Sequence, residues 1–252
     1  MGQGHQDGEH QGRARALSSQ AVERPGALKV LSGNGPRAAV RELCRQFEHA
    51  TGHTVDLQFE VNPDVVRKAE AGERFDVAVG NPHTIDRLIE CGKAVPGSRV
   101  DFGRSGLAAA VKSGAPRPDI GTAESFKRTL LGLKAVAFPG EGASGVYFVG
   151  LLDRMGIAAQ MQGKLKPMKA EDCVEVVARG EADMVVVVAT RMMGVAGVDV
   201  IGPLPEDLQT KIGFAAGLSA STTEPDAATA LIRFISAPSA APTLRKNGVE
   251  PC

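Results

Sequence analysis

Two loops in this sequence carry residue types that could bind an anion. Both Ser32–Arg37 and Pro139–Gly145 follow a short apolar run and lead into a helix-like pattern. Their backbone N–H groups and the positive ends of the two helix dipoles would therefore point at a bound anion. The hydroxyls of Ser32 and Ser144 and the amide of Asn34 could donate further hydrogen bonds. We expect a ligand held between two halves of the protein.

Further polar side chains stand where strand-like runs end, and such ends face the ligand crevice of an α/β sheet. Asn62, Asn81, Thr190 and Arg191 occupy these places. Gly145 directly follows Ser144, which could cap the next helix and still share the N–H groups of its loop with an anion. We predict that these residues contribute to the binding site.

Arg104, Ser105 and Tyr147 are also candidates for ligand contact. A guanidinium can hold a carboxylate through two parallel hydrogen bonds, so Arg104 could bind one between the halves, or instead form a surface ion pair with Asp101. The phenol of Tyr147, the only tyrosine, could donate to a bound oxygen or simply pack with Phe148.

The candidate side chains leave two ligand classes open. Neutral donors such as Ser32 and Ser144 suffice for a tetrahedral oxyanion. The cations Arg104 and Arg191 are better suited to a di- or tricarboxylate, because separated carboxylates usually need cationic partners.

Composition excludes several other functions. Lysine plus arginine equals aspartate plus glutamate at 29 each, and tryptophan is absent, so we expect no nucleic-acid partner. The four cysteines form no CxxC pair and the five histidines no HExxH motif, so we expect no metal and no cofactor. No Ser-His-Asp or Cys-His arrangement is visible, which argues against acyl transfer.

The chain after residue 26 alternates between strand-like and helix-like patterns, which predicts βαβ units and a largely parallel sheet. The predicted strands are Leu28–Leu31, Thr54–Glu60, Phe75–Val79, Gly106–Val111, Ala135–Phe138, Met184–Val188, Val198–Ile201 and Gly213–Ser219. The predicted helices are Arg37–Thr51, Pro63–Ala71, Thr84–Cys91, Ala123–Leu131, Val146–Met155, Ala170–Arg179, Pro225–Ser236 and Pro238–Asn247. Met184–Val188 has no polar alternation and should be a central strand covered on both faces.

Residues 1–26 are polar, rich in glycine and glutamine, and lack the apolar segment of a secretory signal. We predict a disordered tail and, for the chain as written, a cytoplasmic location. A start codon further upstream would make a periplasmic location possible.

One alternative uses the first loop differently. Gly33-x-Gly35-x-x-Ala38 follows a strand, opens a helix and precedes a second strand that ends at Glu60. This spacing formally meets the dinucleotide-binding fingerprint. Pro36 and Arg37 count against it, because the Arg37 slot is usually apolar in that turn and Pro36 is an ordinary first helical residue.

Several segments, in order and spacing, resemble the molybdate-type solute-binding proteins of ABC transporters. They are Leu28–Gly35, Phe47–Glu48, Ala50–Gly52, Ala71–Glu73, Phe75–Val77, Gly97–Val100, Arg104–Gly106, Ala143–Phe148, Val198–Leu208 and Ala227–Pro238. The strand Met184–Ala189 departs from the family pattern, since it stays aliphatic where relatives are more polar, and leaves Arg191 as a substitute contact.

The resemblance implies an α/β, two-lobed, type II periplasmic-binding-protein fold, each lobe a mainly parallel sheet flanked by helices. Residues 27–104 with 205–251 would form the first lobe and residues 105–204 the second. The leading hypothesis is a monomer that binds a small anion in the cleft. Its possible partner is the membrane component of an ABC transporter. An intracellular anion sensor is an alternative.

A further alternative is enzymatic, because some proteins similar to this family are aconitate isomerases. Moving a proton on a tricarboxylate needs a base within hydrogen-bond reach of the carbon acid. Glu60, Glu141 and Tyr147 are the candidates for that base.

Overall fold

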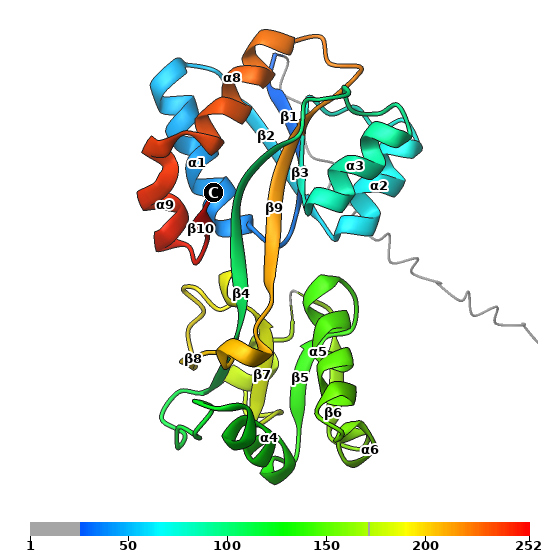
Figure 1. Ribbon diagram of the computed structural model, residues 1–252. Coiled ribbons are helices and arrows are strands. Elements are labelled where there is room, and N and C mark those ends of the chain that lie inside the picture. The colour runs from blue at the N-terminus through cyan, green and yellow to red at the C-terminus, as the bar shows by residue number, and fades with distance from the viewer. Residues whose placement is uncertain (1–25, 171) are drawn as a thin grey trace, which may run out of the picture.

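The computed structural model describes residues 26–170 and 172–252, and in it the chain folds into two lobes joined by two long strands (Figure 1). The predicted tail, residues 1–26, lies outside the described residues except for Gly26. Within the described residues, no helix combines the length and apolar character needed to cross a bilayer.

The first lobe has a sheet whose strands follow the order β2-β1-β3-β9-β4. Its strands are β1 (Leu28–Gly33), β2 (Val55–Glu60), β3 (Val77–Gly80), β9 (Lys211–Leu218), the first half of β4 (Val100–Lys112) and the short β10 (Glu250–Pro251). Its helices are α1 (Arg37–Thr51), α2 (Asn62–Glu70), α3 (Pro82–Glu90), α8 (Pro225–Ser236) and α9 (Ala241–Lys246), with a 3-10 turn at Pro238–Ala240.

The second lobe continues the sheet from β4 in the order β4-β7-β5-β6, with β8 also paired to β4. Its strands are β5 (Val136–Pro139), β6 (Leu165–Met168), β7 (Met184–Val188) and β8 (Val198–Pro203). Its helices are α4 (Ala123–Gly132), α5 (Ala143–Arg154), α6 (Ala158–Met161) and α7 (Glu175–Ala178), with 3-10 turns at Ala189–Arg191 and Glu206–Leu208.

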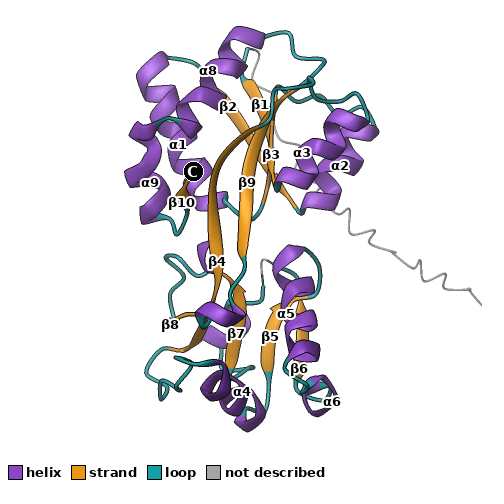
Figure 2. Cartoon of the chain, in the orientation of Figure 1, coloured by secondary structure: helices purple, strands orange, loops and turns teal. Residues whose placement is uncertain are grey.

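Strand β4 runs through both lobes. Its residues 100–106 pair with β9, whereas residues 107–111 pair with β7. Figure 2 shows β4 and β9 passing side by side between the lobes. The predicted lobe boundaries at residues 104/105 and 204/205 stay predictions.

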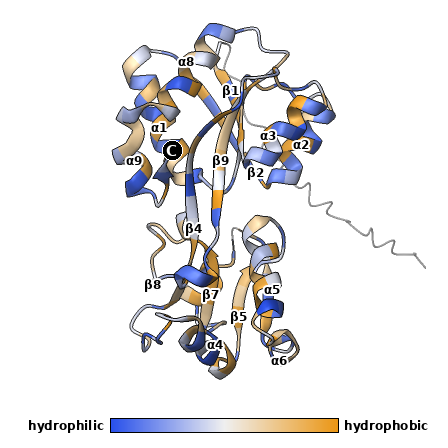
Figure 3. Cartoon of the chain, in the orientation of Figure 1, coloured by the Kyte–Doolittle hydropathy of each residue, from blue (hydrophilic) through white to orange (hydrophobic). Residues whose placement is uncertain are grey.

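Hydrophobic periodicity explains the helices that the sequence predicted. In α1, Val40, Leu43 and Phe47 are almost completely buried and form one stripe, and the helix begins and ends where predicted. Gly52 ends it with a positive φ of 76°, a conformation that glycine adopts without steric cost. Helix α8 also has its predicted bounds. The helices carry hydrophilic and hydrophobic stretches in turn (Figure 3).

Strand β7 confirms the prediction of a strand covered on both faces, since all five of its residues are buried. It lies between β4 and β5 and packs into hydrophobic clusters on both sides of the sheet. Figure 3 shows β5 and β7 as apolar strands beside α5.

The sheet is less parallel than predicted. Strands β1, β2 and β3 are parallel in one lobe and β5, β6 and β7 in the other, but β4, β8 and β9 run antiparallel to their neighbours. Strand β4 is longer than predicted, β6, β10 and α6 were not predicted, and α7 is shorter than the predicted helix Ala170–Arg179.

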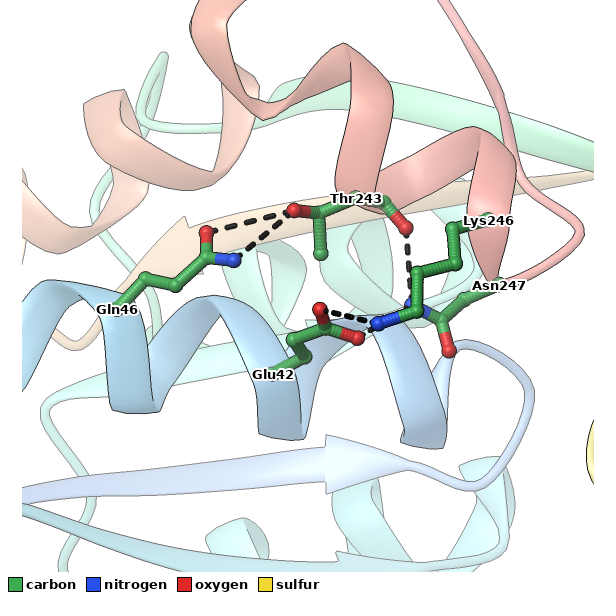
Figure 4. Close-up of polar contacts among 5 residues, drawn as sticks. All are labelled: Glu42, Gln46, Thr243, Lys246 and Asn247. Atoms are coloured by element: carbon green, nitrogen blue, oxygen red, sulfur yellow. Dashed lines mark hydrogen bonds and ion pairs between the residues drawn. The ribbon is translucent and has the colours of Figure 1, made fainter.

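Polar contacts tie α9 to α1 on the outside of the first lobe (Figure 4). Glu42 Oε1 pairs with Lys246 Nζ at 2.9 Å, and Glu42 Oε2 accepts from Asn247 Nδ2 at 3.0 Å. Gln46 Nε2 donates to the Thr243 hydroxyl at 3.0 Å. These contacts link segments that lie about 200 residues apart in the chain.

Candidate functional site

Residues from both lobes line a small cavity of about 70 Å³ in the cleft between them, here called the inner cavity. Its lining residues are Asn34, Gly35, Val61, Asn62, Asn81, Pro139, Glu141, Gly142, Ala143, Ser144, Ala170, Val187, Val188, Arg191, Ile212 and Phe214. The two loops singled out in the sequence thus converge on a shared space.

A larger open cavity of about 660 Å³, the outer cavity, adjoins the inner one. The two share Asn34, Val61, Glu141 and Ala170. The outer cavity is lined in addition by Arg37, Phe59, Glu60, Asp64, Gly140, Pro167, Met168 and Lys169. Together the cavities form a cleft that continues from a narrow interior to a wide mouth.

Helices α1, α2, α3 and α5 all begin beside the inner cavity. None of the four has a side chain that caps its N-terminus. One first-turn N–H of α1, α2 and α3 donates to a nearby backbone carbonyl, whereas α5 shows no such bond in the described part of the chain and can offer its first N–H groups to a ligand. By contrast, Thr122 and Ser125 cap α4 reciprocally, away from the cleft. Helix α8 is uncapped as well, so the notable feature is the convergence of four helix starts. Such an arrangement attracts negative charge.

In the first loop, Asn34 lines both cavities, but Ser32 does not line either. Strand β1 extends to Gly33, so Ser32 belongs to the strand rather than the loop. Its side chain is fully buried, and its hydroxyl donates to the Gly33 carbonyl at 3.0 Å. The Ser32 hydroxyl thus lies outside both cavities, and its contact with a ligand stays a prediction.

Asn62 and Asn81 line the inner cavity side by side. The Asn62 amide donates to Asn81 Oδ1, and Asn81 Nδ2 donates to the Gly213 carbonyl at 2.9 Å. Asn62 Oδ1 is buried without a hydrogen-bond partner in the described part of the chain. The pair fixes the starts of α2 and α3 relative to β9.

In the second loop, Ser144 is 7% exposed and lines the inner cavity. Gly145 is needed for the close packing of α5 on the end of β5, because a Cβ there would lie 1.8 Å from the Pro139 carbonyl oxygen. Gly145 therefore positions the loop and does not itself line the cavity.

Arg191 is the only cationic side chain that lines the inner cavity among the described residues. Its Nε and Nη2 donate to the Ala170 carbonyl at 3.2 and 2.8 Å, which fixes the guanidinium while leaving other N–H donors for a ligand. The neighbouring Thr190 is buried, its hydroxyl has no partner within the described residues, and it does not line the cavity.

Arg104 and Ser105 do not line either cavity. Arg104 is about half exposed, and its Nε pairs with Glu250 Oε2 at 3.4 Å where β10 joins β4. Asp101 pairs with Arg99 instead, at 3.1 Å. Ser105 is 1% exposed on the same strand. These two predicted contacts belong to the strands that join the lobes.

Tyr147 also lies outside the cavity lining. Its hydroxyl donates to the carbonyls of Leu208 and Gln209 at 3.1 and 3.3 Å, and the Arg154 guanidinium lies 4.8 Å from its ring centre. The phenol therefore ties α5 to the segment that enters β9. The Tyr147 ring packs against the hydrophobic cluster that contains Phe148, in line with the packing alternative.

The outer cavity contains two cations, Arg37 and Lys169, that were not among the predicted contacts. Arg37 stacks over Phe59 at 4.7 Å from the ring centre. Lys169 follows β6, a strand whose short Leu-Lys-Pro-Met sequence gives no clear apolar signal. Recognising β6 as a strand would have placed Lys169 at a strand end.

Cys44 and Cys173 are buried, unlike Cys91 and Cys252. Burial raises the pKa of the Cys44 and Cys173 thiols to about 12, so both stay protonated and unreactive at neutral pH. Across residues 26–170 and 172–252, no group of three or more His, Cys, Asp or Glu could hold a metal ion.

A protein family and a curated relative both match nearly the whole chain. Residues 28–250 match the family described as "Bacterial extracellular solute-binding protein". The chain is 31% identical over 241 residues to an aconitate isomerase from Pseudomonas sp, covering 93% of this chain and 90% of that protein.

Solved structures of two binding proteins share the fold. The Azotobacter vinelandii periplasmic molybdate-binding protein has a TM-score of 0.72 at 20% identity, over 88% of this chain and 98% of that one. The sulfate-binding protein SubI from Mycobacterium tuberculosis has a TM-score of 0.72 at 18% identity, over 89% of this chain and 86% of that one. These likenesses confirm the predicted two-lobed α/β fold and favour it over the dinucleotide-binding alternative.

Proposed function

Because the chain belongs to the bacterial extracellular solute-binding protein family, we propose that its cleft binds a small polycarboxylate anion. The observation that carries the proposal is the placement of Arg191 in a cavity where four uncapped helices begin. A guanidinium grips a carboxylate through parallel hydrogen bonds, and the helix N–H groups can hold the remaining oxygens.

The shape of the cleft favours a polycarboxylate over a tetrahedral oxyanion. The inner cavity of about 70 Å³ has room for about two water-sized groups, which suits one carboxylate. The outer cavity continues from it and adds the cations Arg37 and Lys169. An elongated ligand could place one carboxylate beside Arg191 and another near these cations. A tetrahedral oxyanion would use only the inner end, where the Ser32 hydroxyl is absent.

A second candidate function is isomerisation of a tricarboxylate. It is favoured by the identity to aconitate isomerase, which extends over nearly the whole chain rather than over one motif. The same cleft would serve both functions, because an enzyme acting on a tricarboxylate must first bind it. Family membership also supports, as a further proposal, docking to the membrane component of an ABC transporter.

Thermal-shift and calorimetric titrations with two ligand sets test the binding proposal. The polycarboxylates are citrate, cis-aconitate and trans-aconitate, and the oxyanions are molybdate, tungstate and sulfate. A polycarboxylate at 100 times its dissociation constant should stabilise the protein by about 2.7 kcal/mol. Stabilisation by molybdate or tungstate without any by the polycarboxylates would contradict the proposal. Proton NMR of the cis-aconitate sample tests isomerisation, because the trans isomer would appear.

A further inference from the structure

The cleft contains a carboxylate that anion binding does not explain. Glu141 lines both cavities and is the only acidic residue of the inner one among the described residues. A like charge beside a bound anion weakens its binding. A cleft built only to hold anions would gain affinity from a neutral residue at this position.

The fold does not explain Glu141 either. Its carboxylate forms no hydrogen bond or ion pair in the described part of the chain, whereas Glu60 pairs with Lys68 at 2.6 Å. It precedes α5 by two positions and does not cap it, since that helix has no side-chain cap. Glu141 is thus an exposed, unpartnered carboxylate at the mouth of the inner cavity.

The structure separates Glu141 from the other two acid–base candidates. The Tyr147 hydroxyl is committed to the Leu208 and Gln209 carbonyls and lies outside the cavity lining. Glu60 lines only the outer cavity and is neutralised by Lys68. Of the three candidates, only Glu141 lines the inner cavity together with Arg191 and has a carboxylate with no partner among the described residues.

We propose that Glu141 is a catalytic residue that moves a proton between two carbons of an unsaturated tricarboxylate bound in the cleft. This inference rests on the proposed polycarboxylate binding. Glu141 removes a proton from the methylene carbon next to a carboxylate, and the C–H electron pair forms a new carbon–carbon double bond. The electrons of the original double bond form a C–H bond at the far carbon, using the proton that Glu141 returns. No oxidant, reductant or cofactor is consumed.

The surroundings of Glu141 suit this step. Removal of the proton spreads negative charge onto the adjacent carboxylate group of the ligand. The Arg191 guanidinium, fixed by the Ala170 carbonyl, and the uncapped start of α5 can stabilise that charge. The cation and the base come from the same lobe, so their relative position does not depend on closure of the cleft.

The test compares the full-length wild-type protein with Glu141→Gln, Glu141→Asp and the control Glu90→Gln. Glu90 lies at the exposed end of α3 and lines none of these cavities. Each protein is titrated with cis-aconitate by calorimetry. Each is then incubated with cis-aconitate in D₂O, and proton NMR follows both the loss of the methylene signal and the appearance of the trans isomer.

We expect E141Q to bind cis-aconitate as tightly as the wild type or more tightly, while exchange and isomerisation slow by about 10²–10⁴-fold. E141D should restore part of the rate, and E90Q should match the wild type. Isomerisation by E141Q within tenfold of the wild-type rate overturns the assignment. Wild-type binding with neither exchange nor isomerisation overturns it too but leaves the binding proposal intact. Absence of wild-type binding refutes the binding proposal itself.

Discussion

The side chain of Gln209 pairs with both backbone groups of Leu107 at the point where β4 passes from one lobe to the other. Gln209 Oε1 accepts from the Leu107 N–H at 2.7 Å, and Nε2 donates to the Leu107 carbonyl at 2.9 Å. Oε1 also accepts from the Thr210 N–H at 3.0 Å. One amide thus supplies hydrogen bonds that a neighbouring strand would otherwise provide, and it holds the connection between the lobes in one register.

We predict that Gln209→Ala destabilises the protein by about 1–3 kcal/mol, because it leaves the Leu107 N–H without its partner. The Leu107 carbonyl keeps its second hydrogen bond, from the Leu204 N–H at 3.1 Å. Chemical denaturation measures the change. Gln162→Ala is the matched control, since Gln162 is an exposed residue at the end of α6 and should change stability by less than about 0.5 kcal/mol. Equal denaturation midpoints for the two variants would show that the Gln209 bonds contribute nothing net.

Elements with a strong apolar signal could be predicted from the sequence, and those held by tertiary pairing could not. The α1 stripe of Val40, Leu43 and Phe47 fixes a helix by its own periodicity. The first half of β4 reads Val-Asp-Phe-Gly-Arg-Ser-Gly, which lacks that signal, and it is a strand because β9 pairs with it. The two-residue β10 depends wholly on β4 in the same way.

For the candidate site, the sequence predicted which loops line the cleft better than it predicted where each side chain points. The sequence pointed to the two loops, and their residues Asn34 and Ser144 line the inner cavity as Asn62, Asn81 and Arg191 do. It could not give the direction of each side chain, because a shift of one residue in a strand moves a side chain to the opposite face. Ser32 is an example: it is part of strand β1, and its hydroxyl donates to the Gly33 carbonyl.

The two arginines proposed from the sequence should now behave differently. Arg191→Met removes the cation of the inner cavity, so we predict that citrate or cis-aconitate binds about 10- to 100-fold more weakly, as expected for lost charge-assisted hydrogen bonds. Arg104→Met breaks only the exposed pair with Glu250 and should leave affinity unchanged. Calorimetric titration compares them. A larger loss with R104M than with R191M would place the carboxylate site at the lobe junction instead.

Two glycines of α5 provide a second matched pair. Gly145→Ala places a Cβ 1.8 Å from the Pro139 carbonyl oxygen, so α5 must shift away from β5. We predict a loss of about 1–3 kcal/mol in stability, typical of overpacking, and weaker ligand binding because the Ser144 loop moves. Gly150→Ala meets only Arg154 Nη1 at 3.8 Å and should stabilise the helix by about 0.5–1 kcal/mol. Thermal unfolding of both variants measures these changes in stability. Unchanged stability in G145A would mean that the start of α5 has room to adjust.

The contacts of Glu42 with α9 should make stability depend on pH in the acidic range. Hydrogen bonds from Lys246 and Asn247 lower the pKa of the Glu42 carboxyl below its ordinary value of 4.5 (Figure 4). The stabilisation is therefore fully present above about pH 4.5 and is lost as the pH falls through the lowered pKa.

We predict that Glu42→Gln costs less than about 1 kcal/mol at pH 7, because the ion pair is largely exposed, and that the difference from wild type shrinks toward zero below pH 4. Urea denaturation at several pH values measures it, and a Lys246→Met background should remove most of the effect. A difference that stays constant between pH 7 and pH 3 would show that the charge of Glu42 is not what joins the two helices.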